Sequence, residues 1–227
     1  MPRPKVLINF ALTVDGKIST AKFTPTTFTS AYDKKRLLEI RSLGDALMVG
    51  RGTLEKDRMT MGMPDAAFRQ ARKNRGQTAY PLRVIVSGSG KLDRNLPVFG
   101  QTFSPILLFT GRSATAGRDE APWPDHVRVY RSEHDRQDPE QVLSLLYAEY
   151  DVRTLVCEGG PTLIRALAEC DLIDEIYATI APKMFGGEHA PGLLGTSDAF
   201  LSASRAYRMV NLEVHGGEAY LHYRRDR

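Results

Sequence analysis

The chain alternates between short apolar runs and longer segments in which apolar residues recur at helical spacing. The runs are rich in β-branched residues and are bounded by glycine, proline or polar clusters, a pattern typical of buried strands. Alternation of such strands with helices predicts an α/β fold with a mainly parallel central sheet flanked by helices. The expected strands are residues 6–12, 46–49, 82–86, 106–109, 127–130, 154–157, 175–180, 207–214 and 219–223.

The C-terminal end of the sheet is expected to be antiparallel. Gly216 and Gly217 separate the last two runs, and glycine tolerates the positive φ angles of a tight hairpin turn. No internal repeat and no interdomain linker interrupts the pattern, so residues 1–227 are expected to form a single domain.

Three helices are marked by residues that favour helix starts. Ser30 precedes a segment of helical spacing, and in the pair Asp138–Pro139 the proline suits the first helical position. A third helix is expected to open at Gly160–Pro161 and to run to about Cys170, directly after the strand at 154–157.

Residues 58–80 lack a clear period and are expected to form a flap or an insertion. Met59, Met61 and Met63 are spaced by two residues, which is more typical of flexible packing than of a binding surface, although such side chains also suit an adaptable pocket wall. The basic cluster at 69–75 is interpreted as a solvated helix face. The alternative is a surface for nucleic acid or a phosphorylated ligand, but no aromatic residues interleave with the cluster.

Composition and charge narrow the class of protein. The chain has 31 Lys and Arg against 27 Asp and Glu, a net charge of +4, and 42% hydrophobic residues, which is ordinary for a globular domain and excludes disorder and coiled coil. This small excess predicts no nucleic-acid partner. No apolar stretch approaches the ~20 residues of a spanning helix, so no membrane association is expected. Cys157 and Cys170 sit in apolar surroundings and are too few for a disulfide framework, which favours a reducing, cytoplasmic location.

Several catalytic motifs are missing from the sequence. There is no G-x-G-x-x-G after a strand, no G-x-x-x-x-G-K-S/T and no G-x-S-x-G, so the common nucleotide-binding and hydrolase folds lose support. The five histidines lack the spacing of metal ligands and neither cysteine has a C-x-x-C partner, so no metal site is expected.

The most informative segment joins the strand at 154–157 to the helix that follows it. The strand stops at Glu158, and Gly159 and Gly160 precede the helix start at Pro161. Glycines let a ligand approach the backbone, and the free amides and positive dipole end of a helix favour an anion such as a pyrophosphate. The alternative is a tight turn in which the glycines have no ligand.

Two further segments are expected to meet this one. Asp15 and Gly16 follow the first strand, and a stretch from Gly50 through Thr53 to Asp57 follows the second. Because the carboxyl ends of parallel strands share one edge of a sheet, these segments would line a single crevice. Taken alone, Asp15 is more typical of a turn and Asp57 of an exposed helix surface.

In their order and spacing these segments resemble the reductase domain of bacterial and archaeal riboflavin biosynthesis, which has a dihydrofolate-reductase-like fold. The segments that carry the resemblance are 14–18, 41–46, 49–57, 83–86, 158–163, 181–182 and 186–187, and together they span nearly the whole chain.

The resemblance implies an NADPH-dependent reduction of 5-amino-6-(5-phosphoribosylamino)uracil to its ribitylamino product, by hydride transfer to the sugar carbon of the ring-opened imine. It assigns substrate binding to Arg41 and Glu158. Hydride transfer also needs an acid that supplies the compensating proton, and Asp57 and Glu158 are the candidates for this role. The residues that the resemblance assigns to the cofactor are Ala11, Gly50, Thr53, Asp57, Ser87, Gly159, Gly160, Pro161, Thr162 and Leu163.

The sequence departs from the family's pattern at two positions that bind the substrate. Pro64 stands where family members carry an arginine for the substrate phosphate, and Pro25 stands where they carry a serine. Arg58, Arg69 or Arg72 could replace the missing arginine.

These departures leave two alternatives open. One is a reductase of another heterocycle, such as a dihydropterin, and the other is a nucleotide- or nucleic-acid-binding protein without catalysis. The resemblance also implies a homodimer, for which 173–180 and the terminal hairpin offer apolar strands. Arg112 and Ser113 are candidates for the 2′-phosphate of NADPH.

Overall fold

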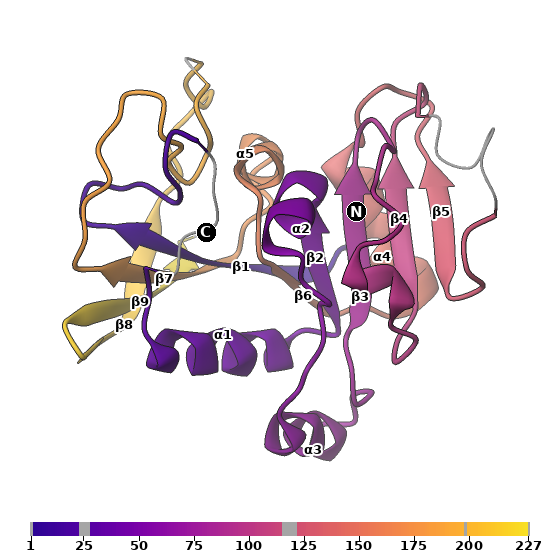
Figure 1. Ribbon diagram of the computed structural model, residues 1–227, viewed down its shortest axis with the longest axis horizontal. Coiled ribbons are helices and arrows are strands. Elements are labelled where there is room, and N and C mark those ends of the chain that lie inside the picture. Colours follow the sequence, from indigo (N-terminus) through magenta and orange to yellow (C-terminus); the bar gives the residue numbers. More distant parts are fainter. Residues whose placement is uncertain (1, 23–27, 115–121, 198, 227) are drawn as a thin grey trace.

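A computed structural model describes residues 2–22, 28–114, 122–197 and 199–226. Within these residues, nine strands form one sheet in the order β5-β4-β3-β2-β6-β1-β7-β9-β8 (Figure 1). The strands are β1 (Lys5–Thr13), β2 (Ala46–Gly50), β3 (Leu82–Ser87), β4 (Ile106–Thr110), β5 (Val127–Arg131), β6 (Thr154–Cys157), β7 (Glu175–Ala181), β8 (Tyr207–His215) and β9 (Glu218–Arg225). The helices are α1 (Ala31–Leu43), α2 (Arg51–Asp57), α3 (Ala66–Asn74), α4 (Pro139–Tyr150) and α5 (Pro161–Glu169), with a 3-10 turn at Pro97–Gly100.

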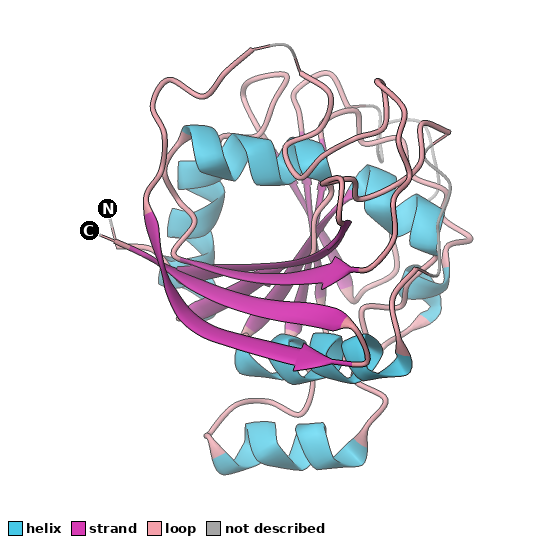
Figure 2. Cartoon of the chain, turned by 90° about the vertical axis from the view of Figure 1, so that its left-hand side faces the viewer, coloured by secondary structure: helices cyan, strands magenta, loops and turns pink. Residues whose placement is uncertain are grey.

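The predicted α/β fold is confirmed. All nine predicted strands are present, and each end lies within two residues of its expected position. Strands β1 to β7 pair in parallel, whereas β9 pairs antiparallel with both β7 and β8, and the β8–β9 hairpin turns at Gly216 and Gly217 with φ angles of +60° and +84°. Figure 2 views the structure from the side of these C-terminal strands.

The three predicted helix starts are also confirmed. Ser30 and Asp138 cap α1 and α4, because their side chains accept hydrogen bonds from the amides of Asp33 and Glu140. Helix α5 follows Gly160 and has Pro161 in its first position. Helix α2 covers the stretch after the second strand, where the sequence marks no helix start.

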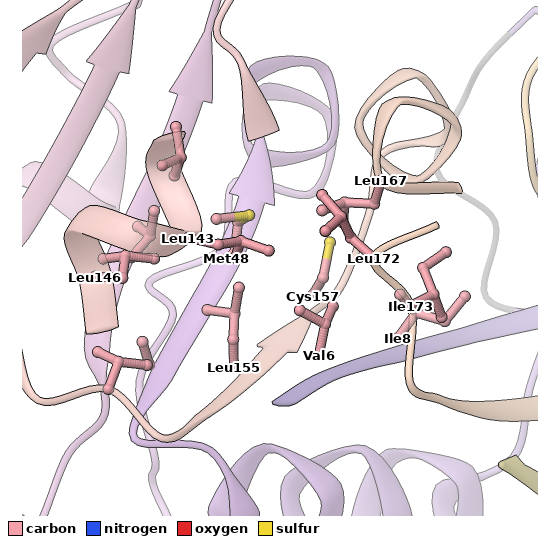
Figure 3. Packing of buried hydrophobic residues seen from close by; sticks show 14 of the residues in the cluster. Val6, Ile8, Met48, Leu143, Leu146, Leu155, Cys157, Leu167, Leu172 and Ile173 are labelled. Carbon is pink, nitrogen blue, oxygen red and sulfur yellow. The ribbon is translucent and has the colours of Figure 1, made fainter. Parts of the chain in front are cut away.

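Apolar side chains cover both faces of the sheet. On one face, residues of α4 and α5 such as Leu143, Leu146 and Leu167 pack on Ile8 and Met48 (Figure 3). On the other face, Ile40 of α1, Leu54 of α2 and Phe99 pack on Leu47 and Val49. Because the central strands are buried on both sides, they read in the sequence as continuous apolar runs.

The two cysteines occupy different environments. Cys157 lies in the core and is fully buried, which raises the pKa of its thiol to about 12. Cys170 is exposed at the end of α5, so the expectation of apolar surroundings was wrong for this residue. Both are free thiols.

The basic cluster at 69–75 serves the packing of α3 against α1. Arg72 is fully buried and donates to the carbonyl oxygens of Thr78 at 2.9 Å, Ser42 at 3.0 Å and Gly44. Arg75 also donates to Ser42, at 2.5 Å. Cations are favoured at this place because the last carbonyls of α1 carry the negative end of its dipole. The interpretation as a solvated face is therefore wrong for Arg72.

No helix in the described ranges is long and apolar enough to cross a membrane.

A candidate active site at the carboxyl edge of the sheet

The candidate site lies where one central strand is shorter than its neighbours. Strand β6 ends at Cys157, which pairs with Ile8 of β1 and Met48 of β2, whereas β1 continues to Thr13. The missing length leaves a cavity of about 250 Å³ beside the carboxyl half of β1. Its lining residues are Asn9, Phe10, Ala11, Ile18, Ser19, Phe28, Thr53, Lys56, Asp57, Glu158, Gly159, Gly160, Pro161, Ile164, Pro191 and Leu193.

The glycine segment after β6 packs tightly against the start of α2. The Gly50 amide donates to the carbonyl oxygen of Gly159 at 2.7 Å, and the Glu158 amide donates to that of Met48 at 3.0 Å. A Cβ on Gly50 would lie 3.2 Å from the Gly160 nitrogen, and a Cβ on Gly160 would lie 2.7 Å from Oγ1 of Thr53. The peptide bond between Gly159 and Gly160 is cis. Glycine is therefore favoured at position 50 by the close approach of another backbone and at position 160 by the side chain of Thr53.

Helix α2 presents one polar face to the cavity. Thr53, Lys56 and Asp57 all line it, because residues three and four positions apart lie on the same side of a helix. The start of α5 lies against Thr53 and also lines the cavity; Gly160 is its N-cap, and no described side chain caps its first turn. A hydroxyl, an ammonium and a carboxylate thus face a helix end that favours anions.

Glu158 is held in a bidentate ion pair by Arg41, from the last turn of α1. Nε and Nη2 of Arg41 donate to the two carboxylate oxygens at 2.8 and 2.7 Å, and the side chains are only 8% and 5% exposed. The third donor, Nη1, reaches the carbonyl oxygen of Gly62 at 2.6 Å. The resemblance assigns Arg41 to the substrate, but in the structure its guanidinium binds Glu158 and the carbonyl oxygen of Gly62.

The second carboxylate of the cavity, Asp57, is held differently. The residue as a whole is exposed at the end of α2, but nearby protein atoms partly desolvate its carboxylate and raise its pKa above the ordinary 3.8. The charge of Glu158 raises the pKa further, while Lys56 opposes the shift. A carboxyl group with a raised pKa is suited to carry a proton.

Among the other predicted site residues, Ala11, Thr53, Gly159, Gly160 and Pro161 line the cavity. Gly50 lies directly behind Gly160, and Thr162 and Leu163 form the first turn of α5. Ser87 lies apart, buried at the end of β3, where its Oγ accepts a hydrogen bond from the Gly90 amide at 3.1 Å.

Asp15 joins two loops at the carboxyl edge of the sheet. Its carboxylate accepts hydrogen bonds from the Thr13 hydroxyl at 2.5 Å and from the amides of Phe185 and Gly186 at 3.2 and 2.7 Å. The Thr13 bond is the largest of these influences, and together they lower the pKa of Asp15. The loop after β1 is thus fixed to the loop after β7, as expected for a turn aspartate.

Sequence reasoning missed several lining residues. Asn9 and Phe10 lie within an apolar run that gave no functional signal, and Pro191 and Leu193 come from a loop without a motif. Lys56 could have been found, because it directly precedes Asp57. Pro25 lies outside the described residues, and no group of metal-ligating side chains occurs among those described.

The fold is that of the pyrimidine reductases of riboflavin biosynthesis. A deaminase and 5-amino-6-(5-phosphoribosylamino)uracil reductase from Thermotoga maritima superposes with a TM-score of 0.78 at 24% identity, over 99% of this chain and 57% of that one. A pyrimidine reductase-like protein from Corynebacterium diphtheriae gives 0.79 at 18% identity, over 99% and 92%.

The chain belongs to the RibD C-terminal domain family, whose sequence model matches residues 4–216. A 2,5-diamino-6-ribosylamino-4(3H)-pyrimidinone 5′-phosphate reductase from Archaeoglobus fulgidus is 28% identical over 92% of this chain and 94% of its own length. The enzyme of that name from Methanothermobacter thermautotrophicus is 31% identical over 85% and 84%. By contrast, the chain spans about half of the riboflavin biosynthesis protein RibD from Bacillus amyloliquefaciens, at 25% identity.

Proposed function

We propose that this chain is an NADPH-dependent reductase of riboflavin biosynthesis that converts a phosphoribosylaminopyrimidine into its ribitylamino product. The observation that carries this proposal is the cavity itself, in which two carboxylates with different environments lie beside a glycine cradle at a helix start. Hydride transfer requires an orienting pocket and a source for the compensating proton, and this arrangement supplies both.

Two substrates are compatible with the relatives, and they differ by an amino group or an oxygen on the pyrimidine ring. The two archaeal enzymes that match over most of their length are named for the diaminopyrimidinone 5′-phosphate. The Thermotoga maritima protein is named for the phosphoribosylaminouracil, the compound that the sequence suggested. We place the diaminopyrimidinone first and the uracil compound second.

The glycine cradle fits the phosphates of NADPH. The close approach of Gly50 and Gly160 leaves mainly backbone at this part of the cavity wall. No described side chain caps the first turn of α5, where the Leu163 amide donates to the carbonyl oxygen of Gly160 and the Thr162 amide would face an anion. Gly160 through Leu163 would line the site of the diphosphate, and Ala11 and Thr53 would also contact the cofactor. NADPH, when bound, supplies the hydride that reduces the sugar carbon.

The chain's own carboxylates then perform different tasks. Reduction of a C=N bond to an amine needs a hydride on carbon and a proton on nitrogen, and Asp57, with its raised pKa, supplies the proton. Glu158 is fixed by Arg41 with both oxygens engaged, so its remaining lone pairs accept hydrogen bonds from substrate hydroxyl or ring N–H groups. Arg41 acts on the substrate through Glu158.

We further propose that the protein is cytoplasmic, because its two cysteines are free thiols. We also propose that it is a homodimer. Strand β8 is the edge of the sheet, and Val210, Leu212 and Val214 on it are 41%, 53% and 70% exposed. A row of exposed apolar side chains on an edge strand favours association with a second copy. Residues 173–180 contribute less, because Ile173 and Ala178 are buried. Light scattering should give about twice the 25.3 kDa chain mass, and the mass of one chain would contradict the dimer.

The decisive experiment is oxidation of NADPH by the purified chain, with each of the two pyrimidines and a dihydropterin offered separately. We expect turnover of the diaminopyrimidinone phosphate and none of the dihydropterin. Gly160→Asp is a loss-of-binding variant, because its Cβ would lie 2.7 Å from Oγ1 of Thr53 and its carboxylate would repel the cofactor phosphates, so NADPH binding should be lost in a titration. Turnover of the dihydropterin alone, or no binding of NADPH by the native chain, would refute the proposal.

A further inference from the structure

Cationic side chains gather at the amino edge of the sheet, the edge opposite the candidate active site. An open hollow of about 860 Å³ lies there. Its lining residues are Arg3, Pro4, Lys5, Asp174, Arg208, Arg224, Arg225 and Asp226. Five cationic side chains thus line the hollow with only two acidic ones, whereas basic and acidic residues are nearly balanced, at 31 to 27, over the whole chain. The excess of positive charge favours an anionic ligand.

Three of these cations lie in one row across neighbouring strands. Glu175 of β7 pairs with Arg224 of β9, and Arg224 pairs in turn with Arg208 of β8. Lys5 of β1 lies two residues before Leu7, the residue that pairs with Glu175, so its side chain is on the same face of the sheet. The row therefore holds one acid among three cations.

The single acid of this row is shared between two permanent cations. Lys5 and Arg224 both contact Oε1 of the buried Glu175, at 2.6 and 2.9 Å, and their own side chains are 47% and 46% exposed. Arg224 uses only its Nε in this contact, and its two terminal nitrogens donate to no described residue. One carboxylate cannot neutralise two cations, so positive charge remains at the surface of the hollow.

Arg208 is the cation that the fold leaves uncompensated. Its side chain is exposed and makes no hydrogen bond or ion pair with a residue that the structure describes. The residue directly opposite it, Arg224, carries the same charge, and like charges in this position destabilise a pair of strands. A charge that is kept at a cost to folding is typical of a functional site.

The proposed dimer surface does not cover Arg208. Leu212 and Val214 of β8 lie opposite Leu221 and Ala219 of β9. Both partners are an odd number of residues from Arg224, so their side chains point to the other face of the hairpin. The row of cations stays open to a ligand when a second copy associates through these apolar residues.

We propose that the hollow at the amino edge binds a compact polyphosphate, an anion with two or more linked phosphate groups, and that this site is separate from the cofactor and substrate sites. Lys5 would bind as a point charge, and Arg208 and Arg224 would present planar pairs of donors. Linked phosphates match a row of cations spread over three strand spacings, about 14 Å, which one phosphate cannot span. No described aromatic side chain lines the hollow, so the phosphates themselves carry the recognition.

Titration calorimetry with inorganic tripolyphosphate, at saturating NADPH, tests this site. Arg208→Gln should raise the Kd about tenfold, as expected for one lost charge-assisted hydrogen bond. The matched control is Arg136→Gln, which removes an exposed arginine that lines neither the hollow nor the cavity and should bind like the native chain. This contrast between two variants locates the anion whether or not the chain proves to be a reductase.

A second variant separates loss of binding from loss of the fold. Arg208→Glu places a carboxylate opposite Arg224, so it should abolish binding while Tm stays equal or rises, because opposite charges stabilise a cross-strand pair. No heat with the native chain, or an equal loss of affinity in Arg208→Gln and Arg136→Gln, would overturn the proposal. Tighter binding of a single-stranded RNA than of tripolyphosphate, at equal phosphate concentration, would also overturn it and assign the surface to nucleic acid.

Discussion

The two ends of the central sheet hold carboxylates whose charges are compensated to very different degrees. At the amino end of β7, Glu175 is 2% exposed and is contacted by Lys5 at 2.6 Å, Arg224 at 2.9 Å and His222 at 3.0 Å. Although burial alone would raise the pKa of Glu175, hydrogen bonds from these partners outweigh it and lower the pKa to about 2. At the carboxyl edge, desolvation dominates and the pKa of Asp57 is raised.

This difference separates a structural carboxylate from a functional one. Glu175 joins β1, β7 and β9, and its charge is fully compensated, so it contributes stability and has no capacity left for a ligand. Asp57 is left in an environment that disfavours its charge, which is unfavourable for folding but useful for proton transfer. Substitutions at the two positions should therefore affect different observables.

The largest effect is expected for Asp57→Asn. Without the proton donor, kcat should fall about 100- to 1,000-fold, a range typical of general acid catalysis. In the native chain, kcat/KM should decline as the pH rises through the raised pKa of Asp57, and this limb should vanish in the variant. Stopped-flow measurement of NADPH oxidation between acidic and neutral pH gives both quantities.

Thermal unfolding of the same variant provides the control. A carboxyl group whose pKa is raised by folding stabilises the native state only below that pKa, so its ionised form opposes folding at neutral pH. Asp57→Asn should therefore leave Tm unchanged or slightly raise it. A fall in Tm together with an unchanged kcat would show that Asp57 stabilises the fold and is not the proton donor.

A smaller effect, of the opposite kind, is expected for Glu175→Gln. Loss of a buried charge that is paired with several cations should lower the free energy of unfolding by about 2–3 kcal/mol, discounted because Lys5 and Arg224 are half exposed. Urea denaturation at neutral pH measures this change, and kcat per folded molecule should be that of the native chain.

The pH dependence of stability gives an independent check on Glu175. Its folded pKa is depressed, so its contribution is present above the ordinary value of 4.5 and is lost as the pH falls toward about 2. The native chain and Glu175→Gln should thus differ in stability at neutral pH and converge in acid. A constant difference down to pH 2 would show that another group is responsible.

The sequence predicted most of the fold and only part of the site. Strand β6 and its neighbours were predictable because burial on both faces makes them continuous apolar runs, and Glu158, Gly159 and Gly160 were predictable because a strand, a turn and a helix start are adjacent in the chain. The helix face at 69–75 was expected to be solvated, and the packing of α3 was missed because it depends on Arg72, a charged residue in a polar segment.

The pairing of Arg41 with Glu158 could not be predicted, because it joins residues 117 positions apart through tertiary structure. The resemblance placed both at the substrate, but only the fold shows that one holds the other. Similarly, nothing local in the sequence indicates that the shortness of β6 creates the cavity, since that depends on the register of β1 and β2.

The smallest effect is expected for Arg41→Lys. Lysine keeps the positive charge but loses the planar pair of donors, so Glu158 should remain compensated yet become less well oriented. We expect kcat/KM to fall about tenfold, equivalent to about 1.4 kcal/mol, with an unchanged Kd for NADPH. Steady-state kinetics and a cofactor titration measure the two quantities.

A double-mutant cycle distinguishes this positioning role from direct binding of the substrate by Arg41. If Arg41 acts through Glu158, then adding Arg41→Lys to Glu158→Gln should cause little further loss, because the orientation of the carboxylate no longer matters. If Arg41 bound the substrate itself, the two losses would add. Additive losses would show that Arg41 binds the substrate directly. They would contradict its proposed role as the residue that orients Glu158.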